Sequence, residues 1–154
     1  MACGKKSRRA IGKVKIMDTL TPEKRSWNMS RIHCKGTKPE EMVRKYLFAQ
    51  GFRYRKNDKR LPGKPDIVLP KYKTVIFVNG CFWHHHEGCK YGTIPKTNTE
   101  FWENKINKTI ERDINEYNQL KALGWKVIII WECETERREF INTMERMISQ
   151  IYNC

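Results

Sequence analysis

Residues 75–89 read VIFVNGCFWHHHEGC, a stretch that joins an apolar run to a dense group of metal-binding side chains. The four apolar residues Val75–Val78 are typical of a short strand that is buried on both faces. After Asn79 and Gly80 the pattern changes, and two cysteines then enclose three consecutive histidines. The stretch therefore predicts a core strand that ends in a chemically active loop.

The sequence on either side supplies the elements that would surround this strand. Residues 37–40, TKPE, form a capping-box pattern with a proline in the first turn, so we expect a helix that ends near Gly51. A long helix is expected from about residue 99 to residue 123, closed by Gly124. The other expected elements are strands at 52–55, 66–69 and 127–131 and an amphipathic helix through Phe140, Met144, Ile148 and Ile151. This α-β-β-β-α-β-α order predicts one α/β domain with a central mixed sheet flanked by helices.

Length and charge narrow the class of protein. The chain has 154 residues, 39% of them hydrophobic, which suffices for one compact core. A formal net charge of +14 favours nucleic acid as a partner, with a solvated basic surface as the alternative. Residues 1–18 are basic and lack an apolar period, so we expect a mobile arm that follows a DNA backbone, or a frayed terminus. Residues 19–154 would then form the functional domain.

The cysteines indicate a reducing compartment. They are too sparse for a secreted disulfide scaffold, and no apolar stretch resembles a signal peptide or could cross a bilayer. We therefore expect a cytoplasmic protein with reduced thiols and no membrane partner. Thiols close to histidines then suggest a metal site. Three cysteines lack such neighbours and receive no role: Cys3, Cys34 and Cys154.

The cysteines near the histidines match a zinc site. Cys81 and Cys89 enclose the histidine run, and Cys133 follows a predicted strand that can approach them. Three thiolates and one imidazole are a common ligand set for a closed, structural Zn²⁺ site. The spacing C-x4-H-x2-C favours His86 as the fourth ligand, although the local sequence does not exclude the two preceding histidines. A zinc site would leave two histidines for chemistry; unliganded core thiols are the alternative.

Three carboxylates are candidates for catalysis. Asp66 opens a predicted buried strand, where nucleases often hold Mg²⁺, or it caps a turn. Asp113 falls within the apolar stripe of the long helix, so we expect it to pair with a histidine of the 84–86 run or with a buried cation. Glu40 is a candidate whose capping-box role would also explain it fully. The expected stripe comprises Trp102, Ile106, Ile110, Ile114, Tyr117 and Leu120.

Two aromatic residues lie inside the metal-binding stretch. Phe82 and Trp83 stand between a predicted zinc ligand and the histidines, in a loop rather than on a periodic face. Large apolar side chains fixed beside a catalytic group suit insertion between base pairs. Trp102, early in the long helix, either joins them or belongs to the core.

Together these motifs resemble the very short patch repair (Vsr) endonucleases. The resemblance runs from about residue 18 to the C-terminus. It rests on RSWNM (25–29), TKPE (37–40), LPGKPD (61–66), VIFVNGCFWHHH (75–86), FWENKI (101–106), ERD (111–113), GW (124–125) and WEC (131–133). It implies a restriction-endonuclease-like endonuclease domain that nicks the strand carrying the thymine of a T:G mismatch, the product of 5-methylcytosine deamination. The implied partners of this monomer are mismatched double-stranded DNA and downstream repair proteins.

The resemblance also implies roles for individual residues. Asp66 would bind the catalytic Mg²⁺, and His84 would act as the general base, oriented by Asp113, with Glu40 near the active site. The implied ligands of the structural Zn²⁺ are Cys81, His86, Cys89 and Cys133. The implied DNA wedge consists of Phe82, Trp83 and Trp102.

The chain departs from some family members at three places. Asn79 replaces a histidine near the scissile phosphate, Val78 replaces a polar residue whose main-chain carbonyl serves the metal, and the spacing between His86 and Cys89 is one residue longer. Three other functions stay open: a related nuclease for another lesion or site, a zinc-stabilised DNA-binding module without catalysis, and a zinc hydrolase. A closed thiolate site disfavours the hydrolase.

Overall fold

The computed structural model describes residues 20–32 and 35–153, in two compact units divided after Ile32. The described part of the first unit contains α1 (Pro22–Ser30), capped by Thr21, whose hydroxyl accepts a hydrogen bond from the main-chain nitrogen of Lys24. None of the α1 residues is buried. This helix was not predicted from the sequence pattern, and the proposed basic arm at residues 1–18 lies outside the described residues, as do Cys3, Cys34 and Cys154.

A four-stranded mixed sheet forms the centre of the second unit, as predicted. Its strands lie in the order β1 (Arg55–Lys56), β2 (Ile67–Leu69), β3 (Thr74–Asn79) and β4 (Lys126–Trp131). The first three pair antiparallel, whereas β3 and β4 run parallel and their last residues, Asn79 and Trp131, are register partners. The loops that follow β3 and β4 therefore leave the sheet at the same edge.

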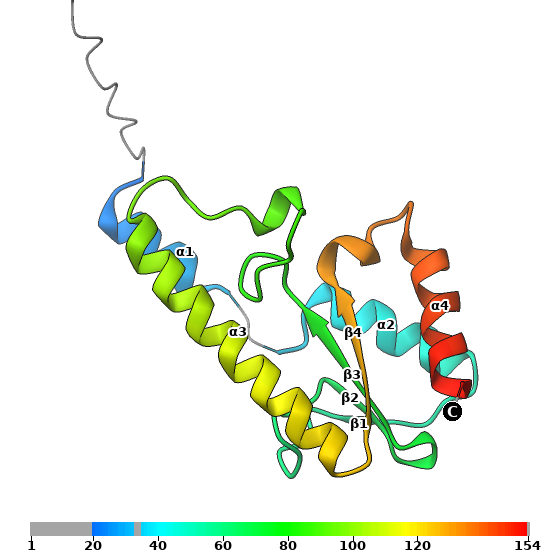
Figure 1. Cartoon of the computed structure of the whole chain (residues 1–154). Coiled ribbons are helices and arrows are strands. Elements are labelled where there is room, and N and C mark those ends of the chain that lie inside the picture. Colours follow the sequence, from blue (N-terminus) through cyan, green and yellow to red (C-terminus); the bar gives the residue numbers. More distant parts are fainter. Residues whose placement is uncertain (1–19, 33–34, 154) are drawn as a thin grey trace, which may run out of the picture. The chain divides into compact units, whose positions relative to one another are not determined.

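Helices cover both faces of this sheet (Figure 1). On one face, α2 (Lys38–Ala49) and α4 (Phe140–Tyr152) pack on the larger core cluster, which includes Leu47, Ile76 and Met144. On the other face, α3 (Thr99–Ala122) packs on a smaller cluster through Leu120. Short 3-10 turns complete the unit: η1 (Pro70–Tyr72), η2 (Lys90–Gly92) and η3 (Glu132–Thr135).

The start of α2 has the local chemistry that the TKPE pattern predicts. Thr37 is the N-cap residue and its hydroxyl accepts a hydrogen bond from the main-chain nitrogen of Glu40, with proline in the first turn. Beyond the helix, Gly51 adopts a φ of 87°, a left-handed conformation that glycine tolerates best. The helix boundaries therefore follow from local sequence.

Two predictions about the elements were wrong. The expected strand at 52–55 is reduced to β1 at Arg55–Lys56, because the main-chain nitrogen of Phe52 instead binds Leu47 O at the end of α2. Ile114, placed on the buried stripe of α3, is 54% exposed. The buried positions of α3 are Ile106, Asp113 and Leu120, at intervals of seven residues. The buried face of the helix is therefore narrower than the expected apolar stripe.

No helix within residues 20–32 and 35–153 is long and apolar enough to span a bilayer.

Candidate active site and metal centre

The four predicted zinc ligands converge at the edge of the sheet where β3 and β4 end. Their ligand atoms all lie within 4.8 Å of one another: Cys81, His86, Cys89 and Cys133. His86 Nδ1 lies 3.6 Å from Cys81 Sγ and 3.3 Å from Cys133 Sγ. Three thiols and an imidazole at this spacing fit a tetrahedral metal ion with sulfur ligands at about 2.3 Å.

The structure separates the roles of the three consecutive histidines. Only His86 faces the thiols, and its ring is stacked on Trp131 with centroids 4.3 Å apart. His85 turns away with a φ of 50°, and its Nδ1 lies 3.2 Å from Gly92 O. His84 Nδ1 lies 2.5 Å from Asp113 Oδ2. Among the three histidines, His86 is therefore the one that lies against the thiols, and His84 is the one paired with a carboxylate.

The thiols have different electrostatic environments. Burial, reinforced by the adjacent thiols, raises the pKa of Cys133 to about 12, and burial also raises the pKa of Cys81. The pKa of Cys89 is lowered, chiefly by a hydrogen bond from the main chain of Tyr91. A Zn²⁺ ion bound here would displace the thiol protons, and its positive charge would offset the repulsion between the resulting thiolates.

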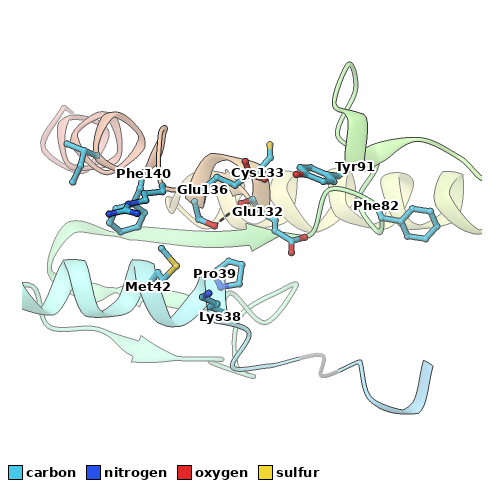
Figure 2. A pocket seen from close by; sticks show the side chains of 12 residues that line it. Lys38, Pro39, Met42, Phe82, Tyr91, Glu132, Cys133, Glu136 and Phe140 are labelled. Atoms are coloured by element: carbon cyan, nitrogen blue, oxygen red, sulfur yellow. Dashed lines mark hydrogen bonds between the residues drawn. The ribbon is translucent and has the colours of Figure 1, made fainter. Parts of the chain in front are cut away.

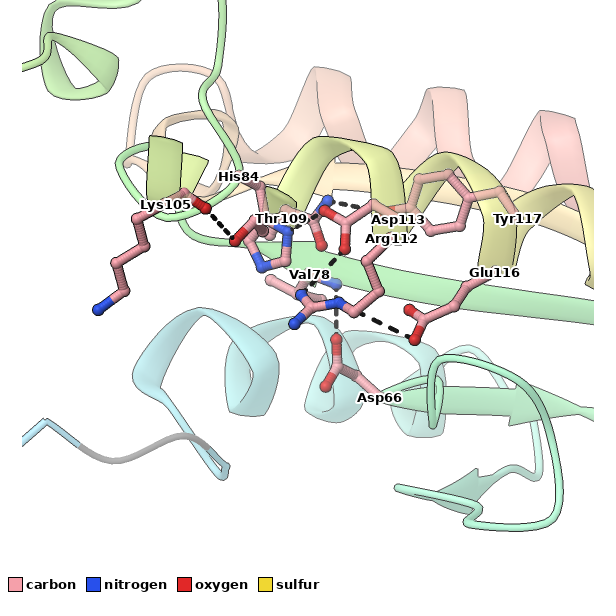
Figure 3. A network of polar contacts seen from close by, with 10 residues as sticks. Asp66, Val78, His84, Lys105, Thr109, Arg112, Asp113, Glu116 and Tyr117 are labelled. Carbon is pink, nitrogen blue, oxygen red and sulfur yellow. Dashed lines mark hydrogen bonds and ion pairs between the residues drawn. The ribbon is translucent and has the colours of Figure 1, made fainter. Parts of the chain in front are cut away.

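Asp66 lies at the start of β2, and its carboxylate is tied to the neighbouring strand. Val78, on β3, donates its main-chain N–H to Asp66 Oδ2 at 2.8 Å, which leaves Oδ1 for another ligand (Figure 3). Burial raises the pKa of Asp66 to about 6, and the nearby charge of Glu40 adds to this effect. A half-buried carboxylate held close to a second carboxylate favours a bound cation, and carboxylate oxygen is a ligand that suits Mg²⁺.

Glu40 is buried at the start of α2, and its carboxylate already has three partners. Gly36 N donates to Oε2 at 3.0 Å, the Thr37 hydroxyl donates to Oε1 at 3.1 Å, and the Arg44 guanidinium lies 3.0 Å from Oε2. These contacts account for the residue as a helix cap and ion-pair partner. They also place its charge close enough to Asp66 to affect that carboxyl group.

Arg44 is a site residue that sequence reasoning missed. Its side chain is buried, and NH2 donates both to Glu40 Oε2 and to Asp66 O, each at 3.0 Å. Its Nε has no hydrogen-bond partner within the described part of the chain. The arginine therefore connects α2 to the main chain that carries Asp66. The sequence signal was a cation four residues after Glu40, which is common on exposed helix faces as well.

Replacing Arg44 with methionine should lower the free energy of unfolding by about 3–5 kcal/mol, because the buried Glu40 carboxylate would lose its counter-ion. The matched control is Lys45→Met, which breaks the solvent-exposed Lys45–Glu41 pair of the same helix, at 3.8 Å. That exposed pair should contribute no more than about 0.5 kcal/mol. Urea denaturation of both variants measures the difference in free energy of unfolding. Equal losses of stability in the two variants would contradict the bridging role of Arg44.

His84 and Asp113 form the central polar pair of the site (Figure 3). Asp113, on the buried face of α3, is 7% exposed and uses Oδ2 for His84 Nδ1. Its Oδ1 accepts a hydrogen bond from Arg112 NH2 at 3.1 Å. With Nδ1–H donating to the carboxylate, the Nε2 lone pair of His84 is free to accept a proton. The predicted partnership of these two residues is thus what the geometry shows.

The three predicted wedge residues form one aromatic cluster. Phe82 lies 5.1 Å from Trp83 and 5.2 Å from Trp102, measured between ring centroids, and the two tryptophans are 6.2 Å apart. Lys105 Nζ lies over both indole rings, at 5.3 Å from Trp83 and 5.5 Å from Trp102. Loop 80–89 and the first turns of α3 therefore present a joint apolar surface beside a cation.

Two hollows border this region. A pocket of about 460 Å³ contains His84 and Asp113. A larger hollow of about 810 Å³ lies between the start of α2, η3 and the start of α4 (Figure 2). Its lining includes Met42, Tyr91 and Phe140 together with charges of both signs, but neither Asp66 nor His84. Of the two hollows, the smaller one is therefore the one that contains the His84–Asp113 pair.

Comparison with known proteins places the chain among DNA endonucleases. Residues 17–90 match the family model described as DNA mismatch endonuclease Vsr. A type II nicking enzyme, V.NmeAIP of Neisseria meningitidis, is 57% identical over 137 residues, 86% of this chain and 97% of that protein. DNA mismatch endonuclease Vsr of Escherichia coli is 46% identical over 115 residues, 75% of this chain and 73% of the relative. With its mixed α/β fold of the restriction-endonuclease-like class, the chain belongs to the Vsr family of DNA mismatch endonucleases.

Proposed function

We propose that this DNA endonuclease nicks the thymine-bearing strand at a T:G mismatch, the product of 5-methylcytosine deamination, and so starts short-patch repair. The observation that carries the proposal is the contact of 2.5 Å between His84 Nδ1 and Asp113 Oδ2, close to the half-buried carboxylate of Asp66. The printed names of the relatives, a mismatch endonuclease and several nicking enzymes, support the same activity.

Asp66 would hold the catalytic metal. Its Oδ1 is free of hydrogen bonds to other described residues, while Val78 N–H fixes Oδ2 and so the plane of the carboxylate. A bound Mg²⁺ would polarise the scissile phosphate and stabilise the charge that develops on it. Arg44 and Glu40 support Asp66: Arg44 is paired with Glu40 and donates a hydrogen bond to Asp66 O, which holds the main chain of Asp66 against α2.

His84 would activate the attacking water. Asp113 accepts the Nδ1 proton and fixes the orientation of the ring, so Nε2 is the nitrogen that takes a proton from water. Arg112 occupies the second oxygen of Asp113 and keeps that carboxylate fully hydrogen-bonded. The pair therefore works as an oriented general base.

The aromatic cluster would open the base stack. Side chains of Phe82, Trp83 and Trp102 that insert between base pairs must overcome stacking, and a mismatched pair yields more readily than a Watson–Crick pair. Phe82 and Trp83 directly precede His84 in the sequence, so bending of the duplex and presentation of its backbone to the His84 imidazole are coupled. This supports selection of a mismatch rather than of an ordinary sequence.

Nicking by His84→Ala and by Asp113→Asn should be at least about 100-fold slower than wild type on a T:G duplex, since an oriented general base contributes on that scale. His85→Ala is the matched control: among described residues the hydrogen-bond partner of His85 is Gly92 O, so this variant should retain most of the activity. A strand-labelled assay on T:G and T:A duplexes measures both rate and strand choice. Near wild-type rates for His84→Ala would refute the mechanism.

The same assay decides between the remaining alternatives. Wild-type nicking confined to T:G duplexes within a library of mismatches supports the proposed substrate. Faster nicking of another lesion would assign the chain to a relative with a different target. Tight DNA binding with no nicking in the presence of Mg²⁺ would leave a zinc-stabilised DNA-binding module.

A further inference from the structure

The polar pocket beside the His84–Asp113 pair has a lining that the mechanism above does not use. Its volume is about 460 Å³, and its walls are the loop Leu61–Lys64 and the second half of α3, completed by Phe77 and His84. Asp66 is not among its lining residues. The pocket is therefore distinct from the carboxylate that would hold the metal, and His84, whose charge affects Asp66, is the lining residue that connects the two.

Tyr117 lines this pocket and carries a hydroxyl group. Asn79 Nδ2 donates a hydrogen bond to Tyr117 Oη at 2.9 Å, and Asn79 is only 4% exposed at the end of β3. The Tyr117 ring packs on Phe77 with centroids 5.0 Å apart, so the hydroxyl is fixed in position. No group within residues 20–32 and 35–153 accepts the phenolic hydrogen. Burial raises the pKa of Tyr117 to about 12, so the hydroxyl keeps this proton at neutral pH.

Arg112 supplies a second set of donors. NH2 donates to Asp113 Oδ1 at 3.1 Å and Nε lies 3.9 Å from Glu116 Oε1, while the side chain stays 57% exposed (Figure 3). A guanidinium group has five N–H donors in a planar fork, so most of them remain for a ligand. Lys64 also lines the pocket and adds a second positive charge.

The two carboxylates of the pocket position these donors. Both oxygens of Asp113 are engaged, one by His84 and one by Arg112. Glu116 packs against the loop: a Cβ atom on Gly63 would lie 2.9 Å from Glu116 Oε2. The donors that stay free in the pocket are the Tyr117 hydroxyl and the remaining N–H groups of Arg112, and such donors suit an oxyanion even beside the Glu116 carboxylate.

We propose that this pocket binds a backbone phosphate of the nicked strand that flanks the scissile phosphate. Tyr117 and Arg112 donate to its non-bridging oxygens, and Asn79 is the positioning residue that holds Tyr117. The proposal rests on the proposed function, because DNA is the polyanion that the chain must align. A second phosphate fixed beside the first sets the register of the strand against His84, and small displacements from that register slow catalysis strongly.

Methylphosphonate substitution tests this pocket. The probes are T:G duplexes that each carry one uncharged methylphosphonate, at the scissile or a neighbouring position, with binding followed by fluorescence anisotropy in Ca²⁺. On the unmodified duplex, Tyr117→Phe and Arg112→Gln should each weaken binding about 10-fold. At one flanking position the methylphosphonate should weaken binding by the wild-type protein by a similar factor. It should cause no further loss of affinity in either variant.

Salt dependence separates the two donors. Arg112→Gln should reduce the slope of log affinity against log salt by about 1, whereas Tyr117→Phe, which removes no charge, should leave the slope unchanged. Asn79→Ala should weaken binding alone but add nothing to Tyr117→Phe. The controls are Tyr152→Phe, with an exposed ring on α4, and Arg146→Gln, which removes an arginine that is 53% exposed and paired with Glu134.

Three results would overturn the proposal. The first is wild-type affinity for the duplex in both Tyr117→Phe and Arg112→Gln. The second is a loss of affinity that is the same on every methylphosphonate duplex. The third is non-additivity between variant and methylphosphonate at the scissile phosphate alone. Wild-type nicking of the unmodified T:G duplex is measured alongside. Mismatch-specific nicking without coupling at a flanking phosphate overturns only the pocket, whereas absence of nicking overturns the proposed function.

Discussion

Asp66→Asn should slow nicking of a T:G duplex by about 1000-fold or more while leaving affinity for the duplex close to wild type, because metal-assisted charge stabilisation supplies several kcal/mol at the transition state. Asparagine preserves the size of the side chain and can still accept the hydrogen bond from Val78 N. It removes the negative charge that would bind Mg²⁺. The expected pattern is thus a large loss of kcat with little change in binding.

The same variant should be more stable than wild type in the absence of Mg²⁺. Burial raises the pKa of Asp66 from its ordinary value of 3.8 to about 6, so the folded chain binds a proton more tightly than the unfolded chain. The contribution of Asp66 to stability is therefore present at low pH and is lost as the pH rises from 3.8 to about 6. At neutral pH the charged carboxylate destabilises the fold by at most about 3 kcal/mol.

Thermal unfolding at several pH values checks this second effect. The stability advantage of Asp66→Asn should be full at neutral pH and should shrink as the pH falls toward 4, the region of the ordinary carboxyl pKa. Added Mg²⁺ should stabilise wild type but not the variant, a readout that does not depend on activity. Undiminished nicking by Asp66→Asn, or equal stabilisation of both proteins by Mg²⁺, would contradict the role of Asp66.

Cys133→Ser should abolish binding of the proposed structural Zn²⁺ and lower the melting temperature by at least about 10 °C. Structural Zn²⁺ contributes many kcal/mol to folding, and each kcal/mol is worth about 2–4 °C in a domain of this size. Cys133 lies on η3, after β4, while the other three ligands lie in the loop after β3. The metal would thus cross-link the loop after β3 to the turn after β4. Its loss should free the loop that carries His84.

The histidine run offers a sharp control for this prediction. His86→Ala should lose the metal as Cys133→Ser does, because His86 Nδ1 faces two of the thiols. His85→Ala should retain it, because His85 contacts Gly92 O instead. Metal content by atomic absorption and melting curves for the three variants give the answer. Retention of zinc by His86→Ala would show that another residue completes the ligand set.

Local sequence was sufficient for most elements of the fold. The TKPE pattern places the start of α2 correctly, and the apolar runs give β3 and β4 to within a residue. These features depend on caps and on periodicity, which act over a few residues. The strand expected at 52–55 is shorter because the main-chain nitrogen of Phe52 closes the end of α2 on Leu47 O, a local helix-capping bond that overrides the alternating pattern.

Sequence by itself determined which chemical groups this protein possesses: a thiol-rich metal motif, a surplus histidine and a carboxylate on an apolar helix face. The tertiary structure decided which groups meet. Parallel pairing of β3 with β4 brings the loop with Cys81 to the turn with Cys133, and packing of α3 on the sheet sets Asp113 against His84 rather than His85. Arg44 and the Asn79–Tyr117 pair could be found only there, because residues 22 and 38 positions apart in the chain, respectively, meet through packing and not through local pattern.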